Sequence, residues 1–339
     1  YNQDGADEGG RNSAGACPCI LKGNITILSQ AVTLVESSKY EHQQVAQEII
    51  EKCLPHAGKS VRIGITGVPG AGKSTSIDAF GMHLIRQGRK LAVLAIDPSS
   101  ERSKGSILGD KTRMEALSRE KNAFIRPSPS AGSLGGVARK TRETIVLCEA
   151  AGFDTVFVET VGVGQSETAV HSMVDFFLLI QLAGTGDELQ GIKRGIMEMA
   201  DGIIINKADG DNLEKAKLAA AQFRNALHLF PAPESSWSPK VLTYSGYYNL
   251  GIKEIWDMVG EYMEFTQKNG YFNYKRNEQA KYWMYESIND TLRETFYHNP
   301  AVEKMLNFTE QQVLNNEISS FVAAKRMMDL FLENLSAKK

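Results

Sequence analysis

A short segment near residue 70 combines glycines, a lysine and a serine at a spacing that suits phosphate binding. The segment "GVPGAGKS" (67–74) fits the pattern G-x-x-x-x-G-K-[ST] and stands between an apolar run, "VRIGIT" (61–66), and a helical pattern. Its glycines let backbone N–H groups turn inward around phosphate oxygens, and the positive end of the following helix attracts the same anion. A chance glycine turn is the alternative interpretation, which the flanking strand and helix make remote.

The residues of this loop have distinct expected roles. Lys73 would reach the β- and γ-phosphates of a nucleotide, and the hydroxyl of Ser74 would bind Mg²⁺. The residues predicted to contact the nucleotide are Gly67, Val68, Pro69, Gly70, Ala71, Gly72, Lys73, Ser74 and Thr75. The chain is therefore expected to bind a nucleoside triphosphate together with Mg²⁺.

A second segment, "NKAD" (206–209), bears on which base is bound. It follows the apolar run "GIIIN" (202–206), and Asp209 can accept hydrogen bonds from the N1–H and the exocyclic amine of guanine. Adenine presents the opposite pattern at that edge, so the pairing favours GTP over ATP. A loop contacting guanine O6 would lie at "SGY" (245–247), after the last apolar run. The residues expected at the base are Asn206, Lys207, Asp209, Ser245, Gly246 and Tyr247.

Three carboxylates stand where strands are expected to approach the phosphates. Asp97 ends the run "LAVLAI", Asp110 lies in "GSILGDKTRM", and Glu159 ends the run "TVFVET". A triphosphate-bound Mg²⁺ takes a few protein oxygens and keeps some water, so Asp97, Asp110 and Glu159 are candidate ligands together with Ser74. Nucleotide hydrolases often carry Asp-x-x-Gly at the place of Glu159, and here Val163 follows the glycine.

One more polar segment could act as a switch. "AGTGDELQGIKRG" (183–195) is rich in glycine and charge and follows the buried run "FFLLIQL" (176–182). It could equally be an ordinary connection, but its glycines and Lys193 make a mobile switch plausible.

The elements that position these residues alternate between short apolar runs and amphipathic helical patterns. The runs expected to be strands are 61–66, 91–96, 122–126, 155–160, 176–182, 202–206 and 240–244. Continuous apolar runs are typical of strands buried on both faces, and hence of a parallel sheet. We predict an α/β fold of the P-loop NTPase kind, a mostly parallel sheet flanked by helices.

Helical segments are expected on both sides of this domain. Residues 24–57 show helical periodicity, and strands stop beyond residue 265. Leu314, Ile318, Phe321, Lys325, Met328, Leu332 and Leu335 repeat at four-three spacing, as in a helix seam. The seam could pack within its own domain or form a dimerisation arm. The predicted organisation is a disordered tail (1–23), a helical segment (24–57), the nucleotide domain (58–265) and a C-terminal helical dimerisation arm (266–339).

Composition excludes several other classes. The net charge of −2 and the pI near 6.4 indicate neither a surface that binds nucleic acid nor one that binds an acidic membrane. The longest apolar runs fall well short of the ~20 residues of a membrane helix. Four cysteines are few for this length and suggest an intracellular protein without a disulfide framework. Cys17 and Cys19 could hold a soft metal, although incidental thiols are the simpler interpretation.

Taken together, the motifs resemble one family of GTPases. "GITGVPGAGKST", "LAIDPSS", "GSILGDKTRM", "FIRPSPSAGSLGGVARKTRE", "FVETVGVGQSE", "LAGTGDELQGIKRGIMEMAD" and "INKADG" are similar to those of the GTPases associated with adenosylcobalamin-dependent methylmalonyl-CoA mutase. These are the MeaB/MMAA type, once labelled ArgK or LAO/AO transport ATPases, of the SIMIBI class of metallochaperone-like P-loop GTPases. The resemblance covers roughly residues 24 to 265.

The resemblance implies specific roles for several residues. Glu159 would replace the usual aspartate of switch II, and Asp97 and Asp110 would coordinate Mg²⁺. Residues 182–193 would form a third switch, with Lys193 as a catalytic or signalling residue. Lys73 and Glu159 would be the other catalytic residues. The tail before residue 24 has no counterpart in the family, and Tyr247 departs from the Ala- or Arg-like residue expected in the guanine loop.

The resemblance also implies partners and an activity. It implies slow hydrolysis of GTP to GDP, accelerated on binding an adenosylcobalamin-dependent acyl-CoA mutase, methylmalonyl-CoA mutase or a close relative. The GTPase would gate cofactor loading and protect the mutase. A homodimer is implied, located in the cytoplasm, or in the mitochondrial matrix of a eukaryote.

Three other functions remain as alternatives at this level. The first is a GTP-dependent metallochaperone for another metalloenzyme, of the nickel type, which Cys17 and Cys19 would motivate. The second is a P-loop small-molecule kinase, which predicts ATP preference and which Asn206–Asp209 argues against. The third is a component of amino-acid transport, for which no membrane segment is visible.

Overall fold

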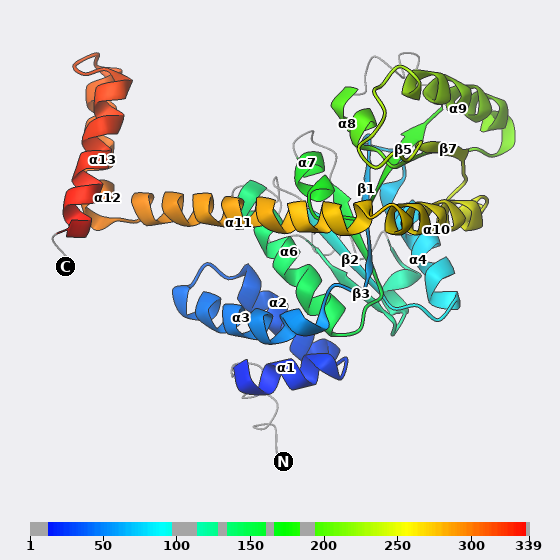
Figure 1. The fold of residues 1–339 in the computed structure, drawn as a ribbon, viewed down its shortest axis with the longest axis horizontal. Coiled ribbons are helices and arrows are strands. Elements are labelled where there is room, and N and C mark those ends of the chain that lie inside the picture. Colours follow the sequence, from blue (N-terminus) through cyan, green and yellow to red (C-terminus); the bar gives the residue numbers. More distant parts are fainter. Residues whose placement is uncertain (1–12, 97–113, 128–133, 161–165, 184–193, 337–339) are drawn as a thin grey trace. The chain divides into compact units, whose positions relative to one another are not determined.

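The structure is a computed structural model of the 339-residue chain. It describes residues 13–96, 114–127, 134–160, 166–183 and 194–336 (Figure 1). The chain divides into two compact units, Tyr1–Gln279 and Ala280–Lys339, and each is described by itself.

The first unit is built on a seven-stranded sheet in the order β3-β2-β4-β1-β5-β6-β7, and every neighbouring pair is parallel. The strands are β1 (Val61–Gly67), β2 (Leu91–Ile96), β3 (Ala123–Arg126), β4 (Thr155–Thr160), β5 (Phe176–Leu182), β6 (Gly202–Asn206) and β7 (Lys240–Thr243). All the predicted strands are therefore present, and their ends agree to within one residue. The central strands β2 and β4 are buried along their whole length, as the unbroken apolar runs indicated.

Helices cover both faces of the sheet. One face carries α4 (Lys73–Arg86) and α10 (Ile252–Lys268), which share a core with Ile63, Leu178 and Ile204. The other face carries α6 (Leu134–Ala150), α7 (Ser166–His171), α8 (Arg194–Met199) and α9 (Leu213–Leu227). Short 3₁₀ turns lie at Leu54–His56, Leu117–Arg119 and Gly210–Asn212. The P-loop NTPase-like α/β fold predicted from the sequence is confirmed.

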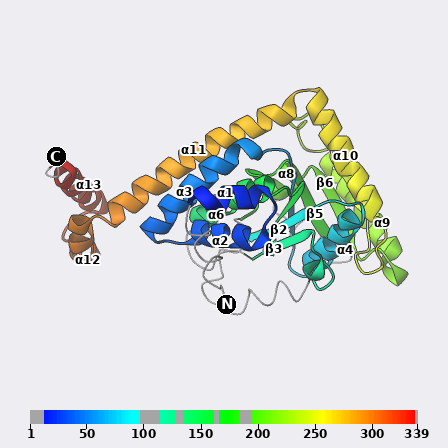
Figure 2. The ribbon, with the colours of Figure 1, turned by 90° about the horizontal axis from the view of Figure 1, so that it is seen from below.

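The N-terminal helices form an additional layer over α6 (Figure 2). They are α1 (Ser13–Leu21), α2 (Ile25–Glu36) and α3 (Tyr40–Cys53). The prediction of a disordered tail over 1–23 is wrong for Ser13–Leu21, because Ala16, Cys17 and Ile20 are buried against α2 and α3. The polar, glycine-rich composition before Ala16 concealed this short apolar stripe.

The connection between α7 and β5 is held by the start of α11 (Tyr271–Tyr297). The guanidinium of Arg276 donates to both carboxylate oxygens of Asp175, at 2.8 and 2.7 Å, and Lys275 Nζ donates to the Asp175 carbonyl at 2.7 Å. Gln279 Nε2 donates to the carbonyl oxygens of His171 and Val174 at 3.3 and 2.8 Å. Asp175 is 2% exposed, so its charge-assisted bonds to Arg276 are shielded from water, and the bond from Gln279 to the His171 carbonyl ties the end of α7 to α11.

The second unit contains the end of α11, then α12 (Pro300–Leu314) and α13 (Ser320–Ser336). The seam predicted from Leu314 to Leu335 does not lie on one helix, because the chain turns between α12 and α13 and Asn316 takes a positive φ of 59°. Within α13, Ala323, Met327 and Phe331 pack inward. The seam residues Phe321, Met328, Leu332 and Leu335 are instead exposed.

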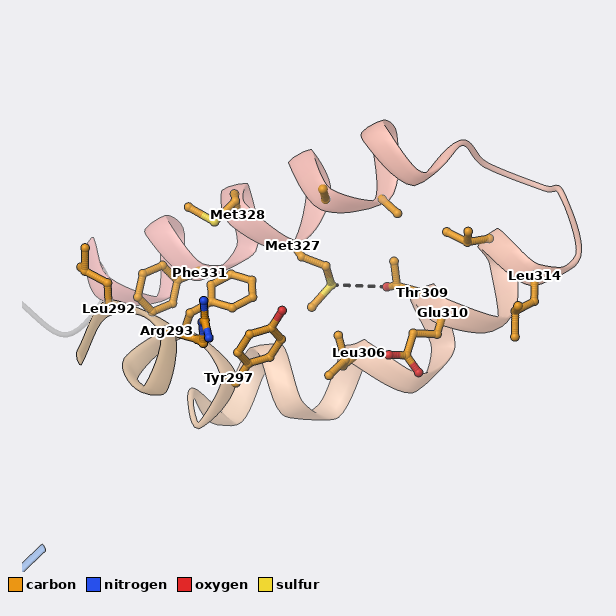
Figure 3. Close-up of a pocket in the computed structure, with 14 residues that line it drawn as sticks. Leu292, Arg293, Tyr297, Leu306, Thr309, Glu310, Leu314, Met327, Met328 and Phe331 are labelled. Carbon is orange, nitrogen blue, oxygen red and sulfur yellow. Dashed lines mark hydrogen bonds between the residues drawn. The ribbon is translucent and has the colours of Figure 1, made fainter. Parts of the chain in front are cut away.

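An apolar groove lies among the helices of this second unit (Figure 3). Its volume is about 740 Å³. Phe296, Tyr297, Leu306, Met327 and Phe331 are among the residues that line it, and the Thr309 hydroxyl donates to the Met327 sulfur at 3.4 Å on its wall.

The described part of the chain contains no helix long and apolar enough to cross a membrane.

Candidate nucleotide site

The predicted phosphate loop connects β1 to α4 at the carboxyl edge of the sheet. A Cβ at Gly67 would lie 2.3 Å from the carbonyl oxygen of Ile180, so β1 can pair with β5 here only with a glycine. Gly72 takes a positive φ of 85°, and a Cβ there would lie 2.7 Å from the side-chain nitrogen of Asn206. Gly67 is therefore required by close approach, and Gly72 by close approach and by its backbone conformation.

Lys73 is the first residue of α4, and its ammonium points back into the loop. Nζ donates to the carbonyl oxygen of Gly67 at 2.8 Å and to that of Val68 at 3.4 Å. Burial lowers the pKa of Lys73 below its ordinary value, while the negative charges of Glu159 and Glu167 act in the opposite direction. Ser74 is half-buried and Thr75 exposed on the next positions of the helix. The loop thus holds a partly desolvated cation where the phosphates are expected.

Asn206 joins the phosphate loop to the base-binding loops. Its Nδ2 donates to the carbonyl oxygen of Ala71 at 2.8 Å, and its Oδ1 accepts from the backbone N–H groups of Lys207 at 2.7 Å and Gly246 at 3.2 Å. Asn206 is 3% exposed, so these bonds are shielded from water. The brace role predicted for Asn206 therefore has a physical basis.

The two segments predicted to surround guanine lie side by side. The hydroxyl of Ser245 hydrogen-bonds to the carboxylate of Asp209, and the Ala208 N–H donates to the carbonyl of Tyr244 at 2.9 Å. Lys207 takes a positive φ of 59° and is exposed, as a side chain that covers a base must be. Tyr247 is 80% exposed and stacks edge-on against Tyr248. Asp209 is thus positioned by Ser245 with its other oxygen available to a base.

Glu159 is a predicted Mg²⁺ ligand. Of the predicted ligands, the structure describes Ser74 and Glu159. Glu159 is the penultimate residue of β4, is 8% exposed, and contributes negative charge near Lys73. The following residue is tied to β1, because the Thr160 hydroxyl donates to that of Thr66 at 2.9 Å. Asp97, Asp110, Val163 and Lys193 lie outside the described residues. Within the described ranges, no group of three or more His, Cys, Asp and Glu side chains could hold a metal ion.

A further carboxylate at the site was missed in the sequence. Glu167 in α7 is 5% exposed and lies near enough to Lys73 to affect its pKa. The only signal for it was a glutamate shortly after the "ETVG" segment, and that position does not distinguish a buried carboxylate from one in solvent.

Cys17 and Cys19 do not form a thiolate pair. They are two residues apart on α1, and side chains at that spacing do not share a helix face. Cys17 is buried and contacts Cys53. Burial, together with this contact, raises the pKa of Cys53 to about 12. Cys17 is thus part of the packing of α1, whereas Cys19 is only partly buried.

Comparison with known proteins shows which family this chain resembles. The family model for "Methylmalonyl Co-A mutase-associated GTPase MeaB" matches residues 28–301. The chain is 47% identical to a probable GTPase of Mycobacterium tuberculosis, covering 93% of this chain and 94% of that protein. It is 44% identical to the GTPase ArgK of Escherichia coli, with coverages of 91% and 94%.

Two further relatives extend the comparison. The mouse "Methylmalonic aciduria type A homolog, mitochondrial" is 44% identical, covering 92% of this chain and 78% of that protein. A crystal structure of a LAO/AO transport system kinase has a TM-score of 0.73 and 37% identity, covering 94% of this chain and 97% of that chain. Because the family model matches most of its length and the mycobacterial, Escherichia coli and mouse relatives are 44–47% identical over more than 90% of it, this chain belongs to the MeaB family of methylmalonyl-CoA mutase-associated GTPases.

Proposed function

We propose that this GTPase is a chaperone of an adenosylcobalamin-dependent acyl-CoA mutase, methylmalonyl-CoA mutase or a close relative. Its GTP cycle would gate loading of the cobalamin cofactor and protect the mutase. The observation that carries the proposal is the family match over residues 28–301, whose description names the mutase. The name of the mouse relative points to the same metabolism. We place the protein in the cytoplasm, or in the mitochondrial matrix of a eukaryote, without nucleic-acid or membrane partners.

Mg²⁺ is the metal that we propose for the site. The donor set suits it, because a hydroxyl and carboxylates are the hard oxygen ligands that Mg²⁺ prefers. Ser74 and the buried Glu159 would hold the ion directly or through water, together with Asp97 and Asp110. When bound, Mg²⁺ supplies positive charge that offsets the negative charge developing between the β- and γ-phosphates.

The mutase role is tested by measuring GTP hydrolysis with and without purified methylmalonyl-CoA mutase. We expect a rise of about tenfold or more, since a partner that adds only ~1.4 kcal/mol of transition-state stabilisation gives tenfold. Lys73→Ala, mixed with the same mutase, reports hydrolysis by contaminating enzymes. An unchanged rate together with no complex in analytical ultracentrifugation would contradict the proposal.

We also propose that the second unit dimerises with a second copy of this chain. The support is an exposed apolar face on α13, with Phe321 86%, Leu332 54% and Met328 46% exposed, beside an apolar groove on the same unit. Monomeric proteins commonly expose single apolar side chains, whereas these residues form a contiguous apolar face. In a two-fold dimer this face would be buried against the same face of the second copy. The alternative from the sequence, in which the seam packs within its own domain, is less favoured because the face that packs inward is a different one.

The double substitution Met328→Glu and Leu332→Glu is expected to convert a dimer to a monomer, because the four carboxylates in the interface, two from each chain, would lose water. Light scattering after size-exclusion chromatography measures the mass. Lys304→Glu on α12 is a matched control, since it makes the same change in net charge at an exposed residue that does not line the groove. A native chain that is monomeric, or a double variant that stays dimeric, would contradict the proposal.

A further inference from the structure

Glu167 is a buried carboxylate to which no role has been assigned. It is 5% exposed, and its Oε2 is buried without a hydrogen-bond partner among the described residues. The hydroxyl of its neighbour Ser166 is fully buried and likewise has none within those ranges. Burying such groups without partners is costly, so a ligand that supplied hydrogen-bond partners here would be favoured.

The backbone of α7 holds Glu167 beside the phosphate loop. α7 follows β4 and packs against β4 and β1. Glu159 is the penultimate residue of β4, and β1 leads into the phosphate loop. The approach to β1 is close, because a Cβ at Gly64 would lie 2.8 Å from the Val170 side chain. The far end of α7 is held by Gln279 and by the ion pair of Asp175 with Arg276. A glutamate in so short and firmly held a segment has little freedom to leave.

The run of α7 places Glu167 towards the phosphate loop. Val170 packs against Gly64 in the middle of β1. Asp175, further along the chain, accepts from the Arg62 N–H near the amino end of that strand. Glu167, one helical turn before Val170, therefore lies towards the carboxyl end of β1, where the phosphate loop begins.

Both Glu159 and Glu167 act on the Lys73 ammonium against the effect of burial. Lys73 belongs at the β- and γ-phosphates once GTP is bound. The packing of α7 thus puts this buried carboxylate on the side of the phosphate loop, and its electrostatic effect on Lys73 agrees with that placement.

We propose that Glu167 accepts a hydrogen bond from the water that attacks the γ-phosphate of GTP and holds that water in line for the reaction. The water oxygen forms a bond to the γ-phosphorus as the bond to the bridging β–γ oxygen breaks. GDP leaves with the bonding pair, and the water proton ends on the inorganic phosphate. Glu167 positions the water and undergoes no net change. Val163, after the glycine that follows Glu159, offers no polar atom for this role.

Two conservative substitutions separate this role from a purely electrostatic one. Glu167→Gln removes the charge but keeps an acceptor oxygen at the same reach, whereas Glu167→Asp keeps the charge and withdraws the acceptor by one methylene. We expect single-turnover hydrolysis of GTP with Mg²⁺ to fall about 100-fold in Glu167→Asp, within the range for a misplaced reacting group. Glu167→Gln should remain within about tenfold of the native rate, because an amide oxygen can orient water.

Affinity is measured beside the rate, with a fluorescent GDP analogue and by competition with GTP. A residue that orients water should leave both dissociation constants within about twofold in both variants, because water orientation matters only in the transition state. Glu264→Asp and Glu264→Gln, at an exposed glutamate of α10 paired with Lys268, are the matched controls.

Three results would overturn the proposal. Hydrolysis at the native rate by Glu167→Asp would show that the reach of the carboxylate is immaterial. A larger loss in Glu167→Gln than in Glu167→Asp would assign the effect to charge on Lys73. Weaker binding of GTP and GDP with an unchanged hydrolysis rate would assign Glu167 to the structure of the loop.

Discussion

Replacing Lys73 by alanine is expected to lower the rate of GTP hydrolysis by about 10²–10³-fold, the usual loss when one preorganised charge is removed from a phosphoryl-transfer site. The Lys73 ammonium donates hydrogen bonds to the carbonyl oxygens of Gly67 and Val68, which hold it in the loop. When GTP binds, the ammonium is expected to contact the phosphates. Affinity for GTP should also fall, since the same cation contacts the ground-state triphosphate. Single-turnover hydrolysis and fluorescent-nucleotide binding measure the two effects.

The fold should survive this change. The pKa of Lys73 is lowered by burial, so the charged form costs the unliganded protein stability, and alanine should not lower its unfolding temperature. Lys268→Ala, at an exposed lysine on α10, is the control and should hydrolyse GTP at the native rate. Normal hydrolysis by Lys73→Ala would contradict the assignment of the phosphate loop.

Replacing Asp209 by asparagine is expected to shift base preference from guanine towards xanthine. The carboxylate can accept from both N1–H and the exocyclic amine of guanine, and each hydrogen bond to a charged group contributes about 1.5–3 kcal/mol. Loss of one such bond predicts roughly 10–100-fold weaker GTP binding. Xanthine carries a carbonyl in place of that amine, and the asparagine amide can donate to it. Competition of GTP, XTP and ATP against a fluorescent GDP analogue measures the shift.

Two observations would test the specificity argument further. Asp211→Asn, two residues along the chain and exposed, changes the same charge away from the base and should leave the preference unaltered. An unchanged ratio of GTP to ATP affinity in Asp209→Asn would contradict guanine recognition by Asp209. In the native protein the Ser245 hydroxyl already occupies one oxygen of this carboxylate, which leaves the other with its remaining lone pairs for the base.

The phosphate loop and the base loop could be predicted because their chemistry resides in contiguous residues. Lys73 and Ser74 follow their glycines directly, and Asp209 follows a strand whose apolar run is unmistakable. The parallel sheet could be predicted for a similar reason, since burial on both faces leaves unbroken apolar runs in the chain. Asp97, Asp110 and Lys193 stay predictions, because they lie outside the described residues.

Other features depend on segments that meet only after folding. The bond from Asn206 to the Ala71 carbonyl spans 135 residues, and no local pattern announces it. Helix α1 exists because a few apolar side chains meet α2 and α3, despite a polar, glycine-rich neighbourhood. The exposed face of α13 could not be told from a buried one, because periodicity shows that a helix has an apolar stripe and not what covers it.

By itself, the sequence determined the nucleotide loops, the order of strands and helices along the chain, and the resemblance to the mutase-associated GTPases. Only the tertiary structure decided that Glu167 is buried, that Asn206 joins two loops, and which stripe of α13 packs inward. The physical reason is that motifs and apolar runs are properties of neighbouring residues. Burial and the partner of a polar group are set by residues brought together from distant parts of the chain.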